Sequence, residues 1–557
     1  MADAYALREE ATAAAAAGDR GRADALFDQS AAAAPGDAGI LNSAALHWAK
    51  AGDSVRAIEL WVQAVSADPG ASEPLINLSI ELTKAGRAAE AADLLAAREA
   101  GLAQDARYWS ARGNAERLAR RRRESLASYE RAWAIDRSNP LIAQGRARMR
   151  LETGVDATAA YRDALGVAPG VGTVILGYGQ ALEVAGETEL ARQIGERLVQ
   201  DLPQWTDALE WLAQLRWAAG EQDSFTDHYG EAAARAPDPT VYASWCRMLG
   251  GVDQFAKAAD AARRGREALG DIPELALLEA VHAGEAGDDE RAGEIFEVLQ
   301  LDSPERRVHE ARHWLRVGSP QRAESLAAAA IDEAPDNIGA WALRGIAWRL
   351  MDDPRHEWLH MQNGLVRPMP LDLTDEQFTA AVALLDRLHD SSAMPVGQSV
   401  RQGSQTRGGL FDRHEPEVAV LEGSFRRAVQ AYREQLPPRD DSHPLLRHRE
   451  DSWRFAGSWS IRVFEGGRHT EHIHPLGIVS SAAYFVVPGP GDGDPQAGWL
   501  ELGRPPPDLR LDLPPLYAIE PRPRQCALFP STLYHGTRRF TGGKRMTVAI
   551  DIHLDRS

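Results

Sequence analysis

The sequence predicts a chain of several domains, in which a long all-α repeat superhelix precedes a small β domain. Its 557 residues are too many for a single hydrophobic core. Up to about residue 355 the chain repeats with a helical period, whereas short β-type runs replace this pattern from about residue 395. Eleven of the sixteen histidines lie from His356 onward. We therefore expect the repeats to be a scaffold and any chemistry to lie in the second part.

Composition excludes several classes of protein. An apolar content of 44% argues against disorder, and no apolar run reaches the roughly 18 residues that a membrane span needs. The two cysteines, Cys246 and Cys526, cannot build a disulfide framework, which predicts a cytoplasmic protein. Lys and Arg number 62 against 81 Asp and Glu, a net charge of −19. This charge disfavours nucleic-acid binding and suits a basic or neutral protein or peptide partner.

The repeat has a period of 34 residues. Turn glycines recur at this step, at Gly18, Gly52 and Gly86. In the second copy, Ala57 lets two helices approach, Trp61 fills the groove between them and Pro69 stops the second helix. The pattern resembles the tetratricopeptide repeat over about residues 5–355, and we place the repeat solenoid at 1–355. The resemblance implies a superhelix whose concave face commonly holds peptides.

The pattern changes after Trp348. Asp352-Asp353-Pro354 ends a helix, and residues 356–390 read as a linker followed by an amphipathic helix that Thr374 and Gln377 cap. A further helix is expected near 417–435. Short β-type runs follow, at 459–464, 480–487, 499–502, 526–529 and 546–552. These runs predict a small β-barrel or jelly roll over residues 391–557.

The strongest chemical signal lies between residues 463 and 547. On a strand, His472 and His474 point the same way, and His535 follows a buried run and a turn. A non-haem iron site needs such a facial set of ligands with open positions. Arg545, ten residues after His535, is suited to clamp a carboxylate, and Thr547 lies on the same face of its strand. Paired histidines alone are more often hydrogen-bonded surface residues; the third histidine and the arginine favour a metal site.

This segment resembles the 2-oxoglutarate/Fe(II)-dependent oxygenases, and more narrowly a prolyl-hydroxylase-like bacterial subfamily often found behind tetratricopeptide repeats. The matching residues are 398–406 (QSVRQGSQT), Val463, Gly466, 472–475 (HIHP), 481–486, 528–530 (LFP), His535-Gly536 and Arg545. The resemblance covers about residues 366–557 and implies a double-stranded β-helix. It implies that His472 and His535 bind iron, that Arg545 holds the C5 carboxylate of 2-oxoglutarate, and that Thr547 assists Arg545. The implied reaction consumes O₂, converts 2-oxoglutarate to succinate and hydroxylates an unactivated C–H bond, with ascorbate as a candidate reductant.

One position departs from the superfamily. His474 stands where most members have Asp or Glu. Three neutral imidazoles leave more positive charge on the iron, which weakens oxidative O₂ activation. We expect His474 to be the third ligand. The alternative is that His474 contacts substrate or supports a ligand, while water or a carboxylate fills its place; Glu471 and Glu501 are the nearest candidates for that carboxylate. A shifted frame, in which His469 and Glu471 form the pair, is also open.

Other residues are candidates for supporting roles. Arg401, Gln405 and Thr406 carry polar side chains in a segment that could line the pocket and contact substrate, although stabilising a turn is an equal alternative. Tyr484 could hydrogen-bond the co-substrate; the alternative is a core tyrosine.

The sequence thus predicts an Fe(II)- and 2-oxoglutarate-dependent dioxygenase that hydroxylates a protein or peptide recruited by the repeats. One alternative is a hydroxylase of an amino acid or another small biosynthetic intermediate. A second is a non-catalytic repeat scaffold with a vestigial oxygenase domain. A three-histidine cupin isomerase or thiol dioxygenase is disfavoured, because those reactions need no dicarboxylate clamp. No membrane or nucleic-acid partner is expected, and the oligomeric state stays open.

Overall fold

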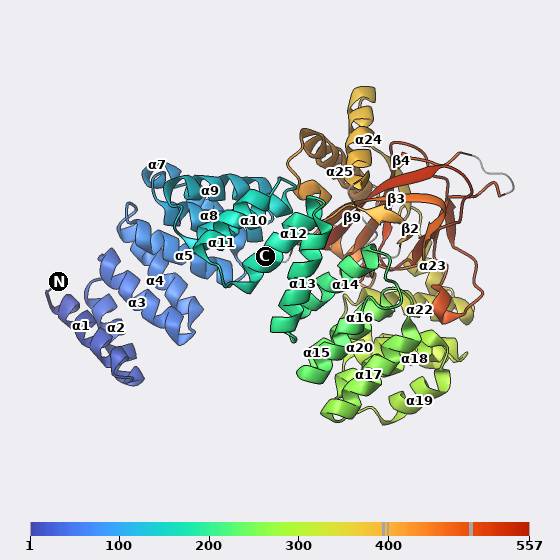
Figure 1. The fold of residues 1–557 in the computed structure, drawn as a ribbon, viewed down its shortest axis with the longest axis horizontal. Coiled ribbons are helices and arrows are strands. Elements are labelled where there is room, and N and C mark those ends of the chain that lie inside the picture. The colour runs from blue at the N-terminus through green and yellow to red at the C-terminus, as the bar shows by residue number, and fades with distance from the viewer. Residues whose placement is uncertain (1, 391, 393–395, 398–399, 490–493, 556–557) are drawn as a thin grey trace. The chain divides into compact units, whose positions relative to one another are not determined.

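The computed structural model describes residues 2–390, 392, 396–397, 400–489 and 494–555 (Figure 1). It divides into two compact units. Unit 1 comprises Met1–Ala181 and Asp412–His414, and unit 2 comprises Leu182–Phe411 and Glu415–Arg556. This division places the later repeats in one unit with the β domain. The boundaries at residues 355 and 390 stay a prediction.

Unit 1 is built from helical pairs. Its helices are α1 (Ala2–Ala16), α2 (Arg20–Ala33), α3 (Ala38–Ala51), α4 (Ser54–Ala67), α5 (Ser72–Lys84), α6 (Ala88–Ala96), α7 (Glu99–Leu102), α8 (Ala106–Leu118), α9 (Arg122–Ile135), α10 (Pro140–Glu152), α11 (Thr158–Val167) and α12 (Gly172–Val184), the last of which continues past residue 181. Gly52 ends α3 with φ +88°, a left-handed conformation that favours glycine. Ala57 and Trp61 are buried, and the Trp61 indole donates to Asn42 over 2.8 Å. The predicted tetratricopeptide-like pairing is therefore confirmed.

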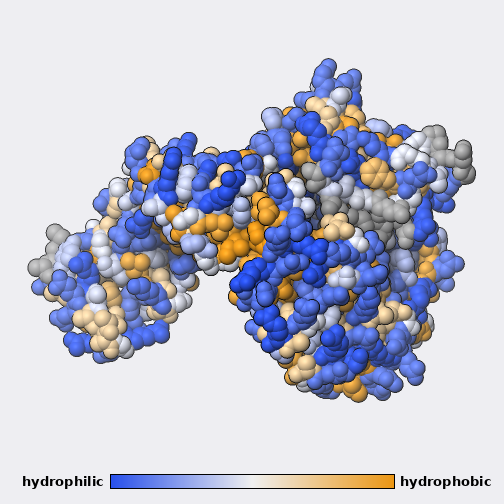
Figure 2. Space-filling view, viewed as in Figure 1, coloured by the Kyte–Doolittle hydropathy of each residue, from blue (hydrophilic) through white to orange (hydrophobic). Residues whose placement is uncertain are grey.

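Unit 2 begins with the remaining helical pairs. They are α13 (Thr188–Asp201), α14 (Thr206–Ala218), α15 (Asp227–Arg235), α16 (Pro239–Gly250), α17 (Phe255–Leu269), α18 (Pro273–Ala286), α19 (Asp289–Val298), α20 (Pro304–Arg316), α21 (Pro320–Glu333), α22 (Ile338–Leu350) and α23 (Arg355–His360). None of the helices among the described residues is both long enough and apolar enough to cross a membrane. Figure 2 shows a largely hydrophilic face with apolar side chains gathered over the region of α10 to α12.

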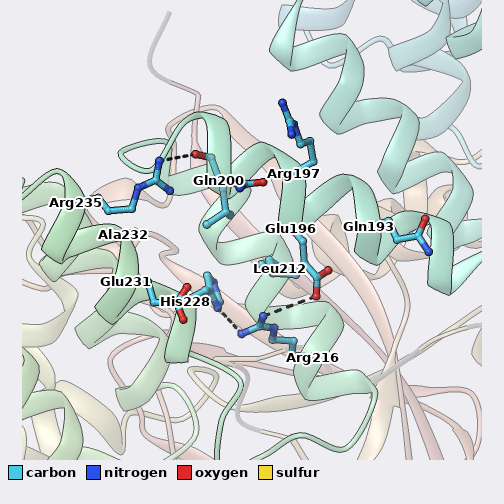
Figure 3. Close-up of a pocket in the computed structure, with 11 residues that line it drawn as sticks. Gln193, Glu196, Arg197, Gln200, Leu212, Arg216, His228, Glu231, Ala232 and Arg235 are labelled. Carbon is cyan, nitrogen blue, oxygen red and sulfur yellow. Dashed lines mark hydrogen bonds and ion pairs between the residues drawn. The ribbon is translucent and has the colours of Figure 1, made fainter.

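One repeat of unit 2 departs from the pattern. Phe225 is buried where a small residue is usual, and α15 starts seven residues after Gly220, whereas α4 starts two residues after Gly52. A cavity of about 510 Å³ lies between α13, α14 and α15 (Figure 3). Its polar walls pair with one another: Arg216 contacts His228 at 3.3 Å, and Arg235 donates to a backbone carbonyl at 2.8 Å. The cavity contains none of the predicted site residues.

The β domain consists of two antiparallel sheets. The six-stranded sheet has the order β1-β7-β4-β9-β3-β2, and the three-stranded sheet has the order β6-β5-β8. Their bounds are β1 (Arg367–Pro370), β2 (Val400–Gln405), β3 (Trp453–His469), β4 (Val479–Val486), β5 (Leu500–Leu502), β6 (Tyr517–Ile519), β7 (Gln525–Pro530), β8 (His535–Thr537) and β9 (Lys544–Leu554). All five predicted β-type runs correspond to strands, which confirms an antiparallel β domain.

Alternation along β9 gives the large sheet two different faces. Met546, Val548, Ile550 and Ile552 are buried in one core with α24 (Asp375–Asp390) and α25 (Pro416–Glu434). The expected cap of α24 is present: the Thr374 backbone N–H donates to the Gln377 side-chain Oε1 at 3.0 Å, and the Gln377 backbone N–H donates to the Thr374 hydroxyl oxygen at 3.2 Å. Successive strand residues point to opposite faces, so Arg545, Thr547 and Asp551 face away from these helices. The side that carries the chemistry is thereby separated from the helical core.

The segment after the repeats packs against the β domain through buried histidines. The His443 ring is fully buried; its Nε2 donates to the Leu359 carbonyl at 3.0 Å, and its Nδ1 accepts from the Leu446 N–H at 3.2 Å. Both ring nitrogens are thus satisfied only in the neutral form. Burial lowers the pKa of His443 to about 4 and that of His360 to about 3.

These histidines predict a loss of stability in acid. A folded-state pKa below the unfolded value of about 6.5 means that the unfolded chain binds more protons, so stability is complete above that pH and falls as pH drops. Between pH 7 and pH 5, each of these histidines should lower the free energy of unfolding by about 2 kcal/mol. Glutamine at position 443 can make both hydrogen bonds without titrating. We expect His443→Gln to show a smaller fall in Tm between these pH values than wild type, measured by thermal unfolding; equal falls would contradict the assignment.

Candidate metal centre

Three histidines from two segments converge on one point. His472, His474 and His535, here called the histidine triad, place one ring nitrogen each within 4.8 Å of the others. The Nε2 atoms of His472 and His474 lie 3.2 Å apart. His472 and His535 form a single antiparallel bridge, with backbone N–O distances of 3.1 and 2.9 Å. The expected convergence is present, although residues 473 and 474 lie outside any strand.

Each triad histidine uses its Nδ1 atom for a hydrogen bond. His472 donates to the Thr470 carbonyl at 2.8 Å and His535 to the Leu533 carbonyl at 3.2 Å. His474 lies 2.7 and 2.9 Å from the two carboxylate oxygens of Asp551. A donor at Nδ1 leaves a lone pair on Nε2 in the neutral ring. Two such lone pairs 3.2 Å apart repel unless a cation lies between them.

The surroundings keep the rings of His472 and His535 neutral. Burial lowers the pKa of His472 to about 3, and the nearby His474 ring contributes. Burial, followed by its two histidine neighbours, also holds the pKa of His535 well below its ordinary value. Neutral imidazole is the form that binds metal ions. The triad therefore has the chemistry of a metal-binding group.

Aromatic rings fix two triad members. The Trp459 ring stacks on His474 with centroids 5.5 Å apart and an interplanar angle of 11°. Phe529 contacts the His535 ring edge-on at 4.9 Å. Both aromatic residues come from the large sheet, on β3 and β7. They limit rotation of the rings and restrict water on these sides.

A buried cationic site lies on the same face of the sheet. Arg545 is 2% exposed, and its guanidinium carbon lies 5.4 Å from the Tyr484 ring centre. Tyr484 is paired in register with Thr547, two residues along from Arg545. The Arg545 Nε and the Tyr484 hydroxyl are buried without a hydrogen-bond partner in the described part of the chain. Burial lowers the pKa of Arg545 and raises that of Tyr484 to about 12.

The buried site around Arg545 is suited to bind an anion. No carboxylate among the described residues pairs with Arg545. A buried charge without a partner is costly, so such a group normally finds a ligand of opposite charge. The Arg545 guanidinium, the Tyr484 phenol and the Thr547 hydroxyl can each donate hydrogen bonds to a carboxylate. The histidine triad and Arg545 thus fit a metal ion and an acid co-ligand respectively.

The remaining predicted residues are placed as follows. The Thr406 hydroxyl accepts from the Ser460 backbone N–H at 2.9 Å, which secures the sheet. Gln405 pairs in register with Ile461, which pairs with Thr547, so Gln405 lies in one row with the cationic site. Gln398, Ser399 and the Arg401 side chain lie outside the described residues. The substrate-binding roles of this segment stay a prediction.

The alternative ligands lie elsewhere. His469 ends β3 and is not a member of the triad, although its ring lies 6.1 Å from that of His472. Glu501 pairs with Arg504 at 2.7 Å. Glu471 is also absent from the group. Among the described residues the geometry therefore favours His472 and His474 as the histidine pair, and not His469 with Glu471.

Sequence reasoning missed Asp551 and Trp459. Asp551 stands at an alternate position of β9, where the opposite face is entirely apolar. Its spacing of six residues from Arg545 places both on one face, and that pattern was visible in the sequence. Trp459 was visible only as a strand residue, since its stacking partner lies 15 residues away on an irregular segment.

Residues 457–551 match the sequence model of the family described as "Putative 2OG-Fe(II) oxygenase". The match spans the complete histidine triad and Arg545. The C-terminal part of the chain therefore contains a domain of this oxygenase family. No curated protein sequence matches the chain.

Solved structures resemble the helical part. One is a tetratricopeptide repeat protein from Parabacteroides merdae ATCC 43184, with 14% identity over 49% of this chain and 96% of that chain and a TM-score of 0.34. A second is pilF of Pseudomonas aeruginosa, with 15% identity over 37% and 96% and a TM-score of 0.32. A third is YrrB, described as a TPR protein with an unusual peptide-binding site, with 14% identity over 33% and 96% and a TM-score of 0.29. The repeat assignment rests on the helical pairs of this chain itself.

Proposed function

We propose that the chain is an Fe(II)- and 2-oxoglutarate-dependent oxygenase. The observation that carries the proposal is the joint presence, in the β domain, of three converging imidazoles and a buried guanidinium that has no carboxylate partner among the described residues. His472, His474 and His535 would hold the iron. Arg545, with Thr547 and Tyr484, would hold the far carboxylate of 2-oxoglutarate.

We infer a double-stranded β-helix from the two antiparallel sheets. The six-stranded and three-stranded sheets share a buried core between them, which includes Tyr484, Leu500 and Phe529. A site between the two sheets would be enclosed on both sides, which excludes water and limits side reactions. We propose the domain boundaries 1–355 for the repeats, 356–390 for the linker and helix, and 391–557 for the oxygenase domain.

Iron with 2-oxoglutarate and O₂ supplies the oxidising power to hydroxylate an unactivated C–H bond, with succinate and carbon dioxide as co-products. The residues of the chain bind and orient. Neutral His472 and His535 present lone pairs, and Asp551 fixes the ring of His474. Arg545 sets the register of the co-substrate, and Trp459 keeps water from the His474 side.

The proposed substrate is a protein or peptide that the repeats recruit in the cytoplasm. Helical repeats form most of the chain, and the net charge of −19 favours a basic or neutral partner. Cys246 and Cys526 are both free and buried, as suits a reducing compartment. A small-molecule substrate is the competing outcome of the test below.

The test is O₂-dependent succinate formation by the iron-loaded full chain. We expect wild type to convert 2-oxoglutarate to succinate, more rapidly when a pool of basic peptides is added, and to leave one oxygen atom on a peptide by mass spectrometry. His535→Ala should reduce the rate of succinate formation at least about 100-fold, since one proposed iron ligand is lost. His553→Ala, on the same domain but outside the triad, is the control.

Each contrary outcome has a clear meaning. Stimulation by amino acids and not by peptides would transfer the proposal to a small substrate. Failure of the wild-type chain to bind either iron or 2-oxoglutarate would contradict the oxygenase and leave a repeat scaffold with an inactive β domain.

A further inference from the structure

We propose that the last repeats form the back wall of the metal site, and that Arg312 and Tyr534 position His535. The inference rests on the proposed function, because it takes the histidine triad as the metal ligands. It assigns to the repeats a role beyond recruitment: they determine how tightly the site binds metal.

The triad is carried by chain segments with little support of their own. Residues 473 and 474 lie outside the strands, and β8 has three residues. A single bridge joins His472 to His535. Metal ligands must be held close to their productive positions by surrounding packing. The support has to come from elements beyond these short segments.

The residues beside the ligands face the repeats. In extended chain, neighbouring side chains point in opposite directions. Ile473 lies between His472 and His474, and Tyr534 precedes His535. Both pack in one hydrophobic cluster with residues of α20 and α22, among them Leu315, Ala342, Leu343, Ile346 and Ala347. The two helices therefore contact the reverse side of both ligand-bearing segments.

A buried ionic cluster adds a directional contact. Arg312 on α20 donates to the Tyr534 hydroxyl at 2.9 Å and to Asp508 at 2.6 Å. Arg316, one turn further, donates to the same Asp508 oxygen at 3.0 Å. Burial alone would favour the neutral acid, but Arg312 and Arg316 hold the pKa of Asp508 below its usual value. The paired charge fixes the Arg312 guanidinium, and through it the Tyr534 ring.

The turn before His535, residues 531–534, has a second support from the repeats. The His360 Nε2, at the end of α23, lies 3.2 Å from the Thr532 hydroxyl. The Tyr534 carbonyl accepts from the Gly503 N–H at 2.7 Å, and the Gly503 carbonyl accepts in turn from Arg349 of α22. Side chains from α20, α22 and α23 thus all reach this turn.

The experiment measures Co(II) affinity of the full chain by chelator competition, with no turnover required. We expect Tyr534→Phe to weaken Co(II) binding about threefold or more and Arg312→Met about tenfold, within the range found for supporting groups of metal ligands. The double variant should bind no more weakly than Arg312→Met alone, because both changes break one contact. The visible spectrum of bound Co(II) should also shift.

Arg447→Met is the matched control. Arg447 also joins the repeats to the β domain, by a 2.6 Å contact with Asp336, but it does not contact residues 531–535. We expect its Co(II) affinity to equal that of wild type. Tyr534→Phe, which removes one hydroxyl, keeps the test valid if Arg312→Met fails to fold.

Two results would overturn the inference in distinguishable ways. Wild-type affinity in Tyr534→Phe and Arg312→Met, with Co(II) bound by the triad, would show that the repeats do not position His535. Absence of Co(II) binding in wild type would refute the metal site itself, and the positioning role with it.

Discussion

Arg545→Met is expected to weaken 2-oxoglutarate binding about 30-fold or more and at the same time to stabilise the protein without co-substrate. Removing one partner of a buried, hydrogen-bonded charge pair costs about 2–5 kcal/mol. Arg545 is 2% exposed and has no carboxylate partner among the described residues, so the co-substrate is its expected counter-ion. Binding is measured by calorimetry on the Co(II)-loaded chain, and Co(II) affinity should stay within about twofold of wild type.

The stability part of this prediction has the opposite sign to that of an ordinary arginine. Replacing a buried charge by an apolar side chain of similar volume removes a desolvation cost, so Tm should rise. Arg462, on the neighbouring strand β3, is the control: it is largely buried but pairs with Asp390 at 2.9 Å. Arg462→Met should lower Tm and leave 2-oxoglutarate binding unchanged. Co-substrate affinity of wild-type strength in Arg545→Met would contradict the assignment of the clamp.

The repeats could be predicted because their determinants are local. A turn glycine, a small residue and an aromatic residue at fixed distances decide how two consecutive helices pack. In the structure Gly52 ends α3, and Ala57 and Trp61 are buried, as their spacing requires. The exception is also local: Phe225 replaces the small residue, and the helix that follows starts late.

The β domain was predictable in its longer strands and in the run at 499–502, which contains β5, but not in the pairing of the small sheet. Strand β9 alternates between a helical core and a polar face over eleven residues, and this period is visible in the sequence. Strands β5, β6 and β8 have three residues each, too few for a period. Their pairing depends on partners far along the chain, so the small sheet could not be derived from local pattern.

The convergence of the three histidines was predictable, but the packing that supports them was not. Histidine spacing indicated the triad before any geometry was known. The contact between Arg312 and Tyr534 joins residues 222 apart, on a repeat helix and a turn. No local signal connects them, because repeat arginines are ordinarily solvated. It follows that deleting residues 1–355 is a poor way to test peptide recruitment, since the deletion would also remove the packing behind His535.

Asp551 supplies a carboxylate next to His474, the position at which this chain lacks the acidic ligand. Most members of the superfamily that the sequence resembles have an acid where this chain has His474. Here a carboxylate contacts the far nitrogen of that histidine, at 2.7 and 2.9 Å. A carboxylate that accepts from Nδ1 raises the electron density on Nε2 and fixes the ring. Part of the negative charge is therefore retained, one residue further from the metal position.

This arrangement predicts graded losses of Co(II) affinity. His474→Ala should weaken binding about 100-fold or more, since a ligand is removed, and Asp551→Asn about tenfold, since asparagine keeps the acceptor but not the charge. Asp386→Asn, an acid on the helical side of the same sheet that pairs with Lys544 at 2.7 Å, is the control and should bind Co(II) normally. The measurement is chelator competition at one pH.

The double variant decides whether Asp551 acts through His474. If it does, Asp551→Asn costs nothing further once His474 is alanine, and the two losses are strongly non-additive. Full additivity would mean that the carboxylate acts on the metal site by another route. An unchanged Co(II) affinity in His474→Ala would assign only His472 and His535 as ligands, and Asp551 would then serve to hold a bystander ring beneath Trp459. The three results are mutually exclusive, so one set of titrations determines the number of histidine ligands and the role of the carboxylate behind them.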